Sequence, residues 1–396
     1  MTLPSALVPC PRPACPGCPL RDVPYADQLE AKRQRVEQAF RERFTPLDAP
    51  FPAVLPTWPS PRVTGYRSSA KLALGRAARG KGAVVGLYER DSHRVLDLRR
   101  CPVHDPLVTA GLRALAGLLD RAPQLLSARV GGQGWLRYAA FQASTADEVL
   151  HVTLVTRSAE DPGLLASLAA RLREAVPRVS GITWNVNPSP GNEIFGPDWR
   201  PLWGNECLYE RLGDHRFRAS PGSFLQANRE QAGWVYRLAR DLLAPGPSDD
   251  VLDLYSGVGS LALHLASGAR RVVGIEGAPQ GAADAAWGAE AAGLAHASFE
   301  TGRVEDVLPR LGAQGFRPTL VTLNPPRKGA APEVLQEILN LAPRAVLYVS
   351  CNPETLARDA AALCRFGAYR LPLVQPVDFF PLTAHVETVA HFEATA

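Results

Sequence analysis

A regular alternation of strand-like and helix-like segments over residues 250–351 constrains the fold of this chain more than any other feature. The strand-like runs are Asp250–Tyr255, Arg271–Glu276, Ala297–Gly302, Thr319–Asn324 and Arg344–Cys351. Segments rich in Ala, Leu and Glu separate them, which is typical of a parallel sheet with helices on both faces. Two later runs, Tyr369–Val377 and Ala384–Phe392, have little between them and favour an antiparallel pair at the sheet's edge. The sequence therefore predicts an α/β fold with a mostly parallel, Rossmann-like sheet.

Residues 61–215 show shorter strand-like runs. These runs are Ser69–Leu74, Ala83–Tyr88, Val95–Leu98, Arg137–Gln142, Glu148–Val155 and Gly181–Val186. A helix-like segment, Gly163–Ala175, lies among them, so we expect a mixed α/β domain. The stretch Pro46–Pro61 is rich in proline and is expected to be a linker. The 396 residues exceed the needs of one average domain, and we expect three units, at residues 1–60, 61–215 and 216–396.

A glycine-containing turn follows the first strand of the alternating region. It reads Asp253-Leu-Tyr-Ser-Gly257-Val-Gly259-Ser260. Glycines there let the backbone approach a ligand closely at the carboxyl end of the strand. The next strand ends in Glu276, 23 residues after Asp253. An acid at this spacing is placed to accept hydrogen bonds from ribose hydroxyls.

The turn lacks the dinucleotide pattern G-x-G-x-x-G, because its last position is Ala262, and it has no P-loop lysine. We therefore expect a ligand that carries adenosine without a pyrophosphate against this turn. S-adenosylmethionine fits that description better than a dinucleotide. An ordinary strand–turn–helix junction is the alternative interpretation.

Cys351 follows directly on the strand that begins at Arg344, at the same rim as the glycine turn. The next helix is expected to begin near Pro353, so Cys351 lies beside a helix N-terminus. That position lowers the pKa of a thiol and favours the nucleophilic thiolate. A buried strand cysteine is common for this residue type and is the alternative. The position at the rim, rather than in mid-strand, favours reactivity.

Two further polar positions are expected at this rim. The fourth strand ends in Asn324-Pro-Pro-Arg327, where an amide can hold a cofactor or the edge of a base. Asn-Pro-Pro followed by an aromatic residue is typical of enzymes that methylate exocyclic amines, and the arginine makes this match partial. In the last strand, His385 and Glu387 are expected on one face. Glu387 is a candidate general base, with a solvated strand carboxylate as the alternative.

A thiol, a carboxylate and a methyl donor suffice to methylate carbon 5 of uracil, which is by itself a poor nucleophile. A thiolate that attacks carbon 6 produces an enolate, whose carbon 5 can take the methyl group from a sulfonium. A base must then remove the proton from carbon 5 so that the thiolate can leave.

Five motifs stand in order along the C-terminal half. They are Ser223-Phe-Leu-Gln226-Ala-Asn228, Asp253-Leu-Tyr-Ser-Gly-Val-Gly259, Asn324-Pro-Pro-Arg327, Ser350-Cys-Asn-Pro-Glu-Thr-Leu-Ala-Arg-Asp359 and His385-Val-Glu387. With them this half resembles the RNA 5-methyluridine methyltransferases, the uracil-C5 family with a class I methyltransferase domain. Upstream, Gly86–Tyr88, Asp97 and Cys101-Pro102 are similar to the family's central domain. The resemblance thus covers nearly the whole chain.

The resemblance implies that Cys351 is the nucleophile and Glu387 the base. It also implies a cofactor site, and together with the glycine turn this site comprises Gln226, Tyr255, Gly257, Ser260, Glu276 and Asn324.

The chain departs from the family's pattern at two positions. Ser256 stands where the family usually has Cys, and Asn324 stands where it usually has Asp. An asparagine at this position can still form hydrogen bonds, but it lacks the negative charge of aspartate. We also expect the N-terminal β-barrel of some members to be absent.

Cysteines crowd near the N-terminus. Cys10, Cys15 and Cys18 lie within nine residues, and Cys101 offers a fourth thiolate. Because the first residues contain no basic signal-peptide region, a metal site is favoured over disulfides. Spacing alone does not choose between zinc and an iron–sulfur cluster. The ribosomal RNA members of the family have a similar arrangement and carry a 4Fe-4S cluster, so the resemblance implies that cluster here.

The segment from Arg62 to Arg100 is basic and carries a net charge of +7, whereas the whole chain carries +4. It predicts a surface that positions an RNA backbone, with a solvated arginine-rich face as the alternative. No apolar run approaches the roughly 20 residues of a membrane span, so we expect no membrane partner and a cytoplasmic location. Nothing in the sequence implies a protein partner.

The leading hypothesis is therefore methylation of carbon 5 of a uridine in 23S ribosomal RNA. The same reaction on the T-loop of transfer RNA is the nearest alternative. Methylation of an exocyclic amine would leave Cys351 and Glu387 without a role. A non-enzymatic RNA-binding metalloprotein would leave the five motifs unexplained.

Overall fold

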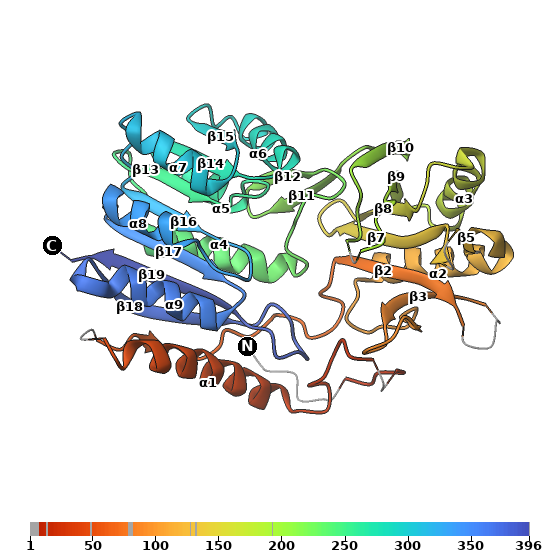
Figure 1. The fold of residues 1–396 in the computed structure, drawn as a ribbon, viewed down its shortest axis with the longest axis horizontal. Coiled ribbons are helices and arrows are strands. Elements are labelled where there is room, and N and C mark those ends of the chain that lie inside the picture. Colours follow the sequence, from red (N-terminus) through yellow and green to blue (C-terminus); the bar gives the residue numbers. More distant parts are fainter. Residues whose placement is uncertain are drawn as a thin grey trace.

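The chain folds around two large sheets (Figure 1). The computed structural model describes residues 8–12, 15–47, 50–77, 82–126, 128–130, 133–191 and 193–395.

The larger sheet comes mostly from the C-terminal part of the chain. Within the described residues its eight strands lie in the order β1-β18-β19-β17-β16-β13-β14-β15. They are β1 (Ala53–Val54), β13 (Asp250–Leu254), β14 (Arg271–Glu276), β15 (Ala297–Thr301), β16 (Leu320–Leu323), β17 (Ala345–Ser350), β18 (Tyr369–Val377) and β19 (Glu387–Ala394). Strands β13 to β17 are mutually parallel, and β19 runs antiparallel between β17 and β18. This arrangement confirms the predicted α/β fold.

Helices cover both faces of the larger sheet. One apolar core includes α1 (Tyr25–Phe44), α7 (Val304–Ala313), α8 (Pro332–Leu341) and α9 (Pro353–Cys364). The other includes α4 (Arg229–Leu243), α5 (Ser260–Ala266) and α6 (Pro279–Ala291). Strand β13 shows why both faces need cover, since Leu252 and Leu254 join the first core and Val251 joins the second. Successive side chains of a strand point to opposite faces, so β13 carries apolar side chains on both faces and is buried on both.

The proline-rich stretch expected to be a linker instead extends this sheet. Strand β1 pairs in parallel with β18, with Ala53 opposite Leu373, and Trp58 forms a further bridge to Val377. Prolines are tolerated beside an outermost strand because their missing N–H is not needed there. The antiparallel pair is therefore covered on its outer side by β1. The predicted domain boundaries at residues 60 and 215 stay a prediction.

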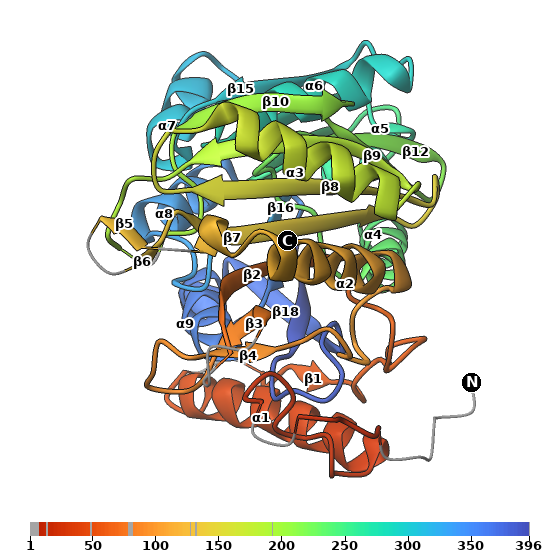
Figure 2. The ribbon, with the colours of Figure 1, turned by 90° about the vertical axis from the view of Figure 1, so that its right-hand side faces the viewer.

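The second sheet is mixed. Its strands lie in the order β10-β9-β8-β7-β2-β3-β4. They are β2 (Ser69–Arg76), β3 (Ala83–Tyr88), β4 (Val95–Asp97), β7 (Leu136–Ser144), β8 (Val149–Thr156), β9 (Val179–Val186) and β10 (Asp198–Gly204). Helices α2 (Pro106–Arg121) and α3 (Pro162–Ala175) share its apolar core and lie in front of it in Figure 2. Its opposite face is turned toward the larger sheet.

Smaller elements complete the described chain. They are the hairpins β5 (Ala128–Val130) with β6 (Gln133–Gly134) and β11 (Leu208–Leu212) with β12 (His215–Ala219), and the 3-10 turns Pro123–Leu126 and Arg365–Gly367. Helix α2 and the strands β10 to β12 were not predicted from the sequence. No helix in the described part of the chain is long and apolar enough to cross a membrane.

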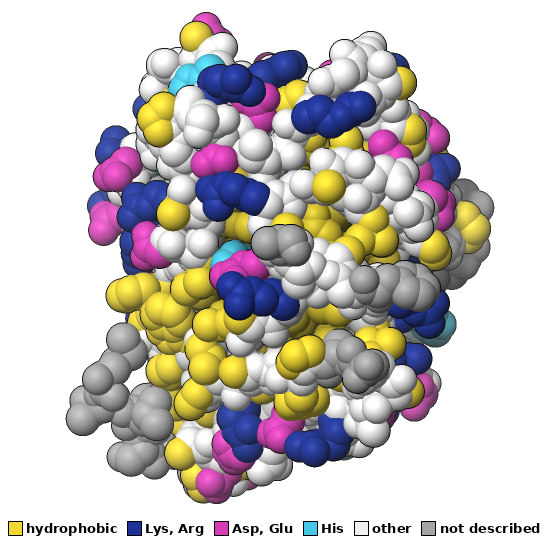
Figure 3. All heavy atoms as spheres, turned by 90° about the vertical axis from the view of Figure 1, so that its left-hand side faces the viewer, with side chains coloured by type: hydrophobic (Ala, Val, Ile, Leu, Met, Phe, Trp, Pro, Cys, Tyr) yellow, Lys and Arg dark blue, Asp and Glu magenta, His cyan; other side chains and the backbone are white. Residues whose placement is uncertain are grey.

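The parallel strands of the larger sheet point toward the second sheet, so their amino ends lie at the opposite end of the molecule. Figure 3 shows that end, where cationic and anionic side chains are interspersed. Ion pairs lie at the starts of these strands, including Arg270 with Asp250 and Arg344 with Asp249. The carboxyl ends therefore meet the second sheet, and ligands of open α/β sheets bind at carboxyl ends.

Candidate active site

A cavity of about 800 Å³ lies at the carboxyl ends of the parallel strands, where the two sheets approach each other. Eight residues predicted as catalytic or cofactor-binding line it: Gln226, Tyr255, Gly257, Ser260, Glu276, Asn324, Cys351 and Glu387. They come from separate segments of the chain, and the fold brings them all to one site.

The turn after β13 has a constrained backbone. Tyr255, Gly257 and Gly259 have positive φ angles of 60°, 56° and 78°. Glycine adopts this region freely, but Tyr255 is strained there, and such strain concentrates at functional sites. The Glu276 carboxylate fastens the turn, because it accepts hydrogen bonds from the backbone N–H groups of Gly257 at 2.8 Å and Ala278 at 2.7 Å. The Glu276 carboxylate thus lies beside the turn and lines the cavity.

Buried polar atoms face this cavity. Asp253 accepts hydrogen bonds from the Thr322 hydroxyl at 2.6 Å and from the Ala262 N–H at 3.2 Å. Burial raises the pKa of Asp253 to about 7. The Ser256 hydroxyl is buried without a hydrogen-bond partner among the described residues. An unsatisfied buried hydroxyl costs about 1–3 kcal/mol, so this wall fits a polar, nucleoside-sized ligand.

The loop that carries Gln226 is held by Asp284, which is fully buried on α6. Its carboxylate accepts hydrogen bonds from the Ser220 N–H at 2.8 Å and from the hydroxyls of Ser220 and Ser223, both at 2.7 Å. Arg218 pairs with the same carboxylate at 2.7 Å. The loop that carries Gln226 is thereby fixed to α6.

Cys351 lies between the end of β17 and the first turn of α9. Asn352 caps that helix, since its side-chain oxygen accepts a hydrogen bond from the Glu354 N–H at 3.2 Å. The expectation that the helix terminus lowers the pKa of the thiol is nevertheless wrong in net direction. Burial, and then the Glu387 carboxylate, raise the pKa of Cys351, while Arg327 lowers it. Desolvation is the largest of these effects, and it disfavours the thiolate.

Glu387 is the first residue of β19 and is 3% exposed. Burial raises its pKa to about 7, and Arg327 acts in the opposite direction. A carboxylate that titrates near neutrality suits a general base. The expectation that His385 shares a strand face with Glu387 is wrong. Leu382, at a φ of 68°, belongs to a turn that delays the start of the strand, and His385 stays exposed outside it.

Arg327 is the site residue whose role the sequence reasoning missed. Its positive charge lowers the pKa of both Cys351 and Glu387. Helix α9 fixes its backbone, because the Asn352 amide and the Thr355 hydroxyl donate to the Arg327 carbonyl at 3.0 and 3.3 Å. Its place in the Asn324–Arg327 motif was the available signal.

Five aromatic side chains also line the cavity and were not predicted. They are Phe195, Trp199, Phe224, Tyr236 and Phe380. Phe224 is 67% exposed, an unusual position for a large apolar ring. It lies inside a recognised motif, whereas Phe195 and Trp199 come from the second sheet, where no motif marked them.

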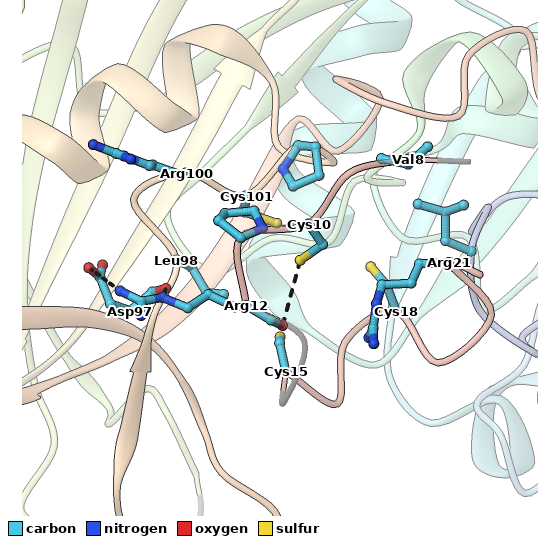
Figure 4. Close-up of a pocket in the computed structure, with 13 residues that line it drawn as sticks. Val8, Cys10, Arg12, Cys15, Cys18, Arg21, Asp97, Leu98, Arg100 and Cys101 are labelled. Atoms are coloured by element: carbon cyan, nitrogen blue, oxygen red, sulfur yellow. Dashed lines mark hydrogen bonds and ion pairs between the residues drawn. The ribbon is translucent and has the colours of Figure 1, made fainter. Parts of the chain in front are cut away.

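The four cysteines of the predicted cluster surround one pocket, with their sulfurs around a common space (Figure 4). Burial, followed by the neighbouring thiols Cys101, Cys15 and Cys10, raises the pKa of Cys18 to about 12. Among the described residues, no group of three or more ligand-type side chains is placed to hold one metal ion.

Comparisons with known proteins identify the family of this chain. The family model described as tRNA (Uracil-5-)-methyltransferase matches residues 208–394. The RNA methyltransferase GSU1452 of Geobacter sulfurreducens is 39% identical over 95% of this chain and 75% of its own length. The RNA methyltransferase BH0687 of Halalkalibacterium halodurans is 36% identical over 97% of this chain and 83% of its own.

A solved structure is also similar over most of the chain. The tRNA (uracil-54, C5)-methyltransferase of Pyrococcus abyssi, in complex with S-adenosyl-L-homocysteine, has a TM-score of 0.76. It is 27% identical, and the match covers 96% of this chain and 86% of that one. Sequence and fold thus agree: the chain belongs to the uracil-C5 RNA methyltransferase family, whose members use S-adenosylmethionine to methylate carbon 5 of uridine in RNA.

Proposed function

We propose that this enzyme methylates a uridine of 23S ribosomal RNA through a covalent adduct on Cys351, with Glu387 as the base. One observation carries the catalytic part of this proposal. Cys351 and Glu387, from neighbouring strands, line the same cavity as the glycine turn.

The reaction follows from these two side chains. The Cys351 thiolate forms a bond to carbon 6 of uracil, and the electron pair of the 5,6 double bond moves into an enolate. Carbon 5 then takes the methyl group from the sulfonium, and S-adenosylhomocysteine is released. Glu387 accepts the proton from carbon 5, the double bond re-forms, and Cys351 leaves as a thiolate. The target base must be unpaired or flipped out to reach Cys351.

In this proposal the methyl donor lies over the glycine turn. Gln226, Tyr255, Gly257, Ser260, Glu276 and Asn324 would line it. Glu276 retains free lone pairs for ribose hydroxyls beside the two backbone bonds that it accepts. The unpartnered Ser256 hydroxyl gives a further polar contact at the same wall.

Replacing the two catalytic candidates is expected to separate their roles. Cys351→Ala removes the nucleophile and should abolish formation of 5-methyluridine, a loss of at least about 10³-fold. Glu387→Gln keeps the nucleophile but removes the base, so methylated RNA should stay covalently bound to Cys351. Denaturing gel electrophoresis and mass spectrometry of the protein–RNA adduct measure both effects.

Cys207→Ser is the matched control, because Cys207 contacts the Ser220 hydroxyl rather than the catalytic pair. It should retain activity. Methylation by Cys351→Ala at the normal rate, or a Glu387→Gln enzyme that turns over without an adduct, would contradict the mechanism.

The pH dependence should reflect the same two groups. Glu387 must be ionised and Cys351 must be a thiolate, so the single-turnover rate should rise through pH 7 and continue upward toward the raised pKa of the thiol. Arg327→Gln removes the cation that lowers both pKa values, and should shift the profile to higher pH by about one unit. Arg327→Lys should shift it less. A profile that is the same in all three enzymes would show that Arg327 does not act through charge.

We also propose that Cys10, Cys15, Cys18 and Cys101 hold a 4Fe-4S cluster rather than zinc. The four thiols line one pocket, and four thiolates are the ligands of a 4Fe-4S cluster.

Protein purified without oxygen should contain about four irons per chain and show the visible absorbance of a cluster. Cys18→Ser should lose most of both, whereas Cys207→Ser should retain them. Stoichiometric zinc with no iron would contradict the cluster and favour a zinc site.

The choice of ribosomal RNA rests on the cysteine arrangement. Transfer RNA is the second candidate, because the similar Pyrococcus abyssi enzyme is a tRNA (uracil-54, C5)-methyltransferase. We expect that deleting the gene removes one 5-methyluridine from 23S ribosomal RNA, as mapped by mass spectrometry of RNA fragments. Loss from the transfer-RNA T-loop instead would keep the mechanism and replace the substrate. No change in any 5-methyluridine would contradict the proposed function in that cell.

A further inference from the structure

The second sheet presents an aromatic pair to the catalytic cavity. Phe195 and Trp199 both line the cavity, although neither belongs to the larger sheet. Their ring centroids are 4.9 Å apart, with the planes tilted by 51°. The Trp199 ring lies so close to Gly222 that a Cβ atom there would be 2.9 Å from it. Gly222 belongs to the loop that carries Gln226, so the pair borders the active site directly.

Buried side chains hold this pair rigidly. The Asn185 amide donates to the carbonyls of Gly196 and Asp198 at 2.9 and 3.1 Å, and its oxygen accepts from the Gly196 N–H at 2.8 Å. The Asn187 amide donates to the Glu193 and Ile194 carbonyls at 2.7 and 3.1 Å. Asn185 and Asn187 are both buried. Both buried side chains form hydrogen bonds only with the backbone of the segment that carries the two rings. They therefore fix the position of these rings.

A cation accompanies the rings. The Lys71 ammonium lies 4.8 Å from the centre of the Phe195 ring, and Lys71 itself is exposed on β2. Its neighbours on the same strand, Ala70 and Leu72, point to the helix-covered core, so Lys71 lies on the uncovered face of the sheet. On this face Ala73 and Tyr138 pack with Phe195.

A second groove lies among strands β2, β3, β4 and β7 of the same sheet. This groove has a volume of about 350 Å³, and its lining includes Arg76, Tyr88, His93 and Arg94. The Tyr88 and His93 rings contact edge to face, with centroids 6.0 Å apart. Aromatic rings and cations therefore occur at both sites on the second sheet, with Phe195 and Trp199 half-buried and Tyr88 exposed.

We propose that Phe195 and Trp199 form a stacking platform for the unpaired nucleotide next to the target uridine, with Lys71 on its phosphate. Single-stranded RNA is recognised by bases that stack on aromatic side chains beside cations. Duplex RNA buries its base faces and cannot use such a platform. The inference rests on the proposed function for the location of the target uridine and adds a specificity surface in the second sheet.

Equilibrium binding tests the platform without any methylation. The probes are fluorescein-labelled nonauridylate and a labelled RNA duplex of 12 base pairs, measured by anisotropy without a methyl donor. Trp199→Ala and Phe195→Ala should each weaken nonauridylate binding by about 5- to 100-fold. Duplex binding, and the affinity for S-adenosylhomocysteine measured by calorimetry, should stay within about twofold of the parent, and Trp199→Phe should recover most of the loss.

Trp203→Ala is the matched control. Trp203 lies on the same strand, is 37% exposed, and contacts Arg173 of α3 on the other side of the sheet. It should bind nonauridylate normally. Unchanged binding by both platform variants, an equal loss in Trp203→Ala, or loss of S-adenosylhomocysteine affinity along with the RNA would overturn the platform. Because no step of the assay needs catalysis, an error in the proposed reaction would leave these results unaffected.

Discussion

A buried ion pair between Lys32 and Asp378 joins the first helix to the segment that leads into the catalytic strand. The Lys32 ammonium lies 2.5 Å from the Asp378 carboxylate, and both side chains are at most 2% exposed. The Tyr25 hydroxyl donates to the same carboxylate at 2.7 Å, and Lys32 also donates to the Phe380 carbonyl at 3.1 Å. Removing one partner of such a pair typically costs about 3–5 kcal/mol. The segment beyond Asp378 is therefore held firmly where it enters the site.

This same segment connects the separate parts of the enzyme. The Leu382 carbonyl accepts a hydrogen bond from the Leu20 N–H at 3.0 Å, next to the cysteine-rich strip. The Pro381 carbonyl accepts from the Tyr66 hydroxyl at 3.2 Å, at the entrance to the second sheet. Phe380 lines the cavity, and Glu387 follows. The thiol pocket, the second sheet and the base are thus all fixed against one short stretch of chain.

The sequence predicted features whose signal is local and missed those that tertiary contacts create. Apolar runs, the glycine turn and the segment around Cys351 each carry a local pattern, so the parallel strands and eight of the residues that line the cavity could be predicted. Strand β1 has two residues, and its pairing depends on β18, far away in the chain. The net pKa shift of Cys351 depends on burial and on Glu387, and Arg327 acts through space. Trp199 belongs to the site only because the second sheet packs beside it.

The long span of the Tyr25–Asp378 bond has a consequence for biosynthesis. These residues are 353 positions apart, and contacts of such separation form late. While the ribosome is still making the middle of the chain, Lys32 and the apolar side of α1 have no partner, although they were among the first parts to emerge. The second sheet draws its contacts from the chain already made and can form earlier. The N-terminal helix is thus made early, but its contacts with the C-terminal segment form last. The nascent enzyme acquires a complete active site only after Glu387 has been synthesised.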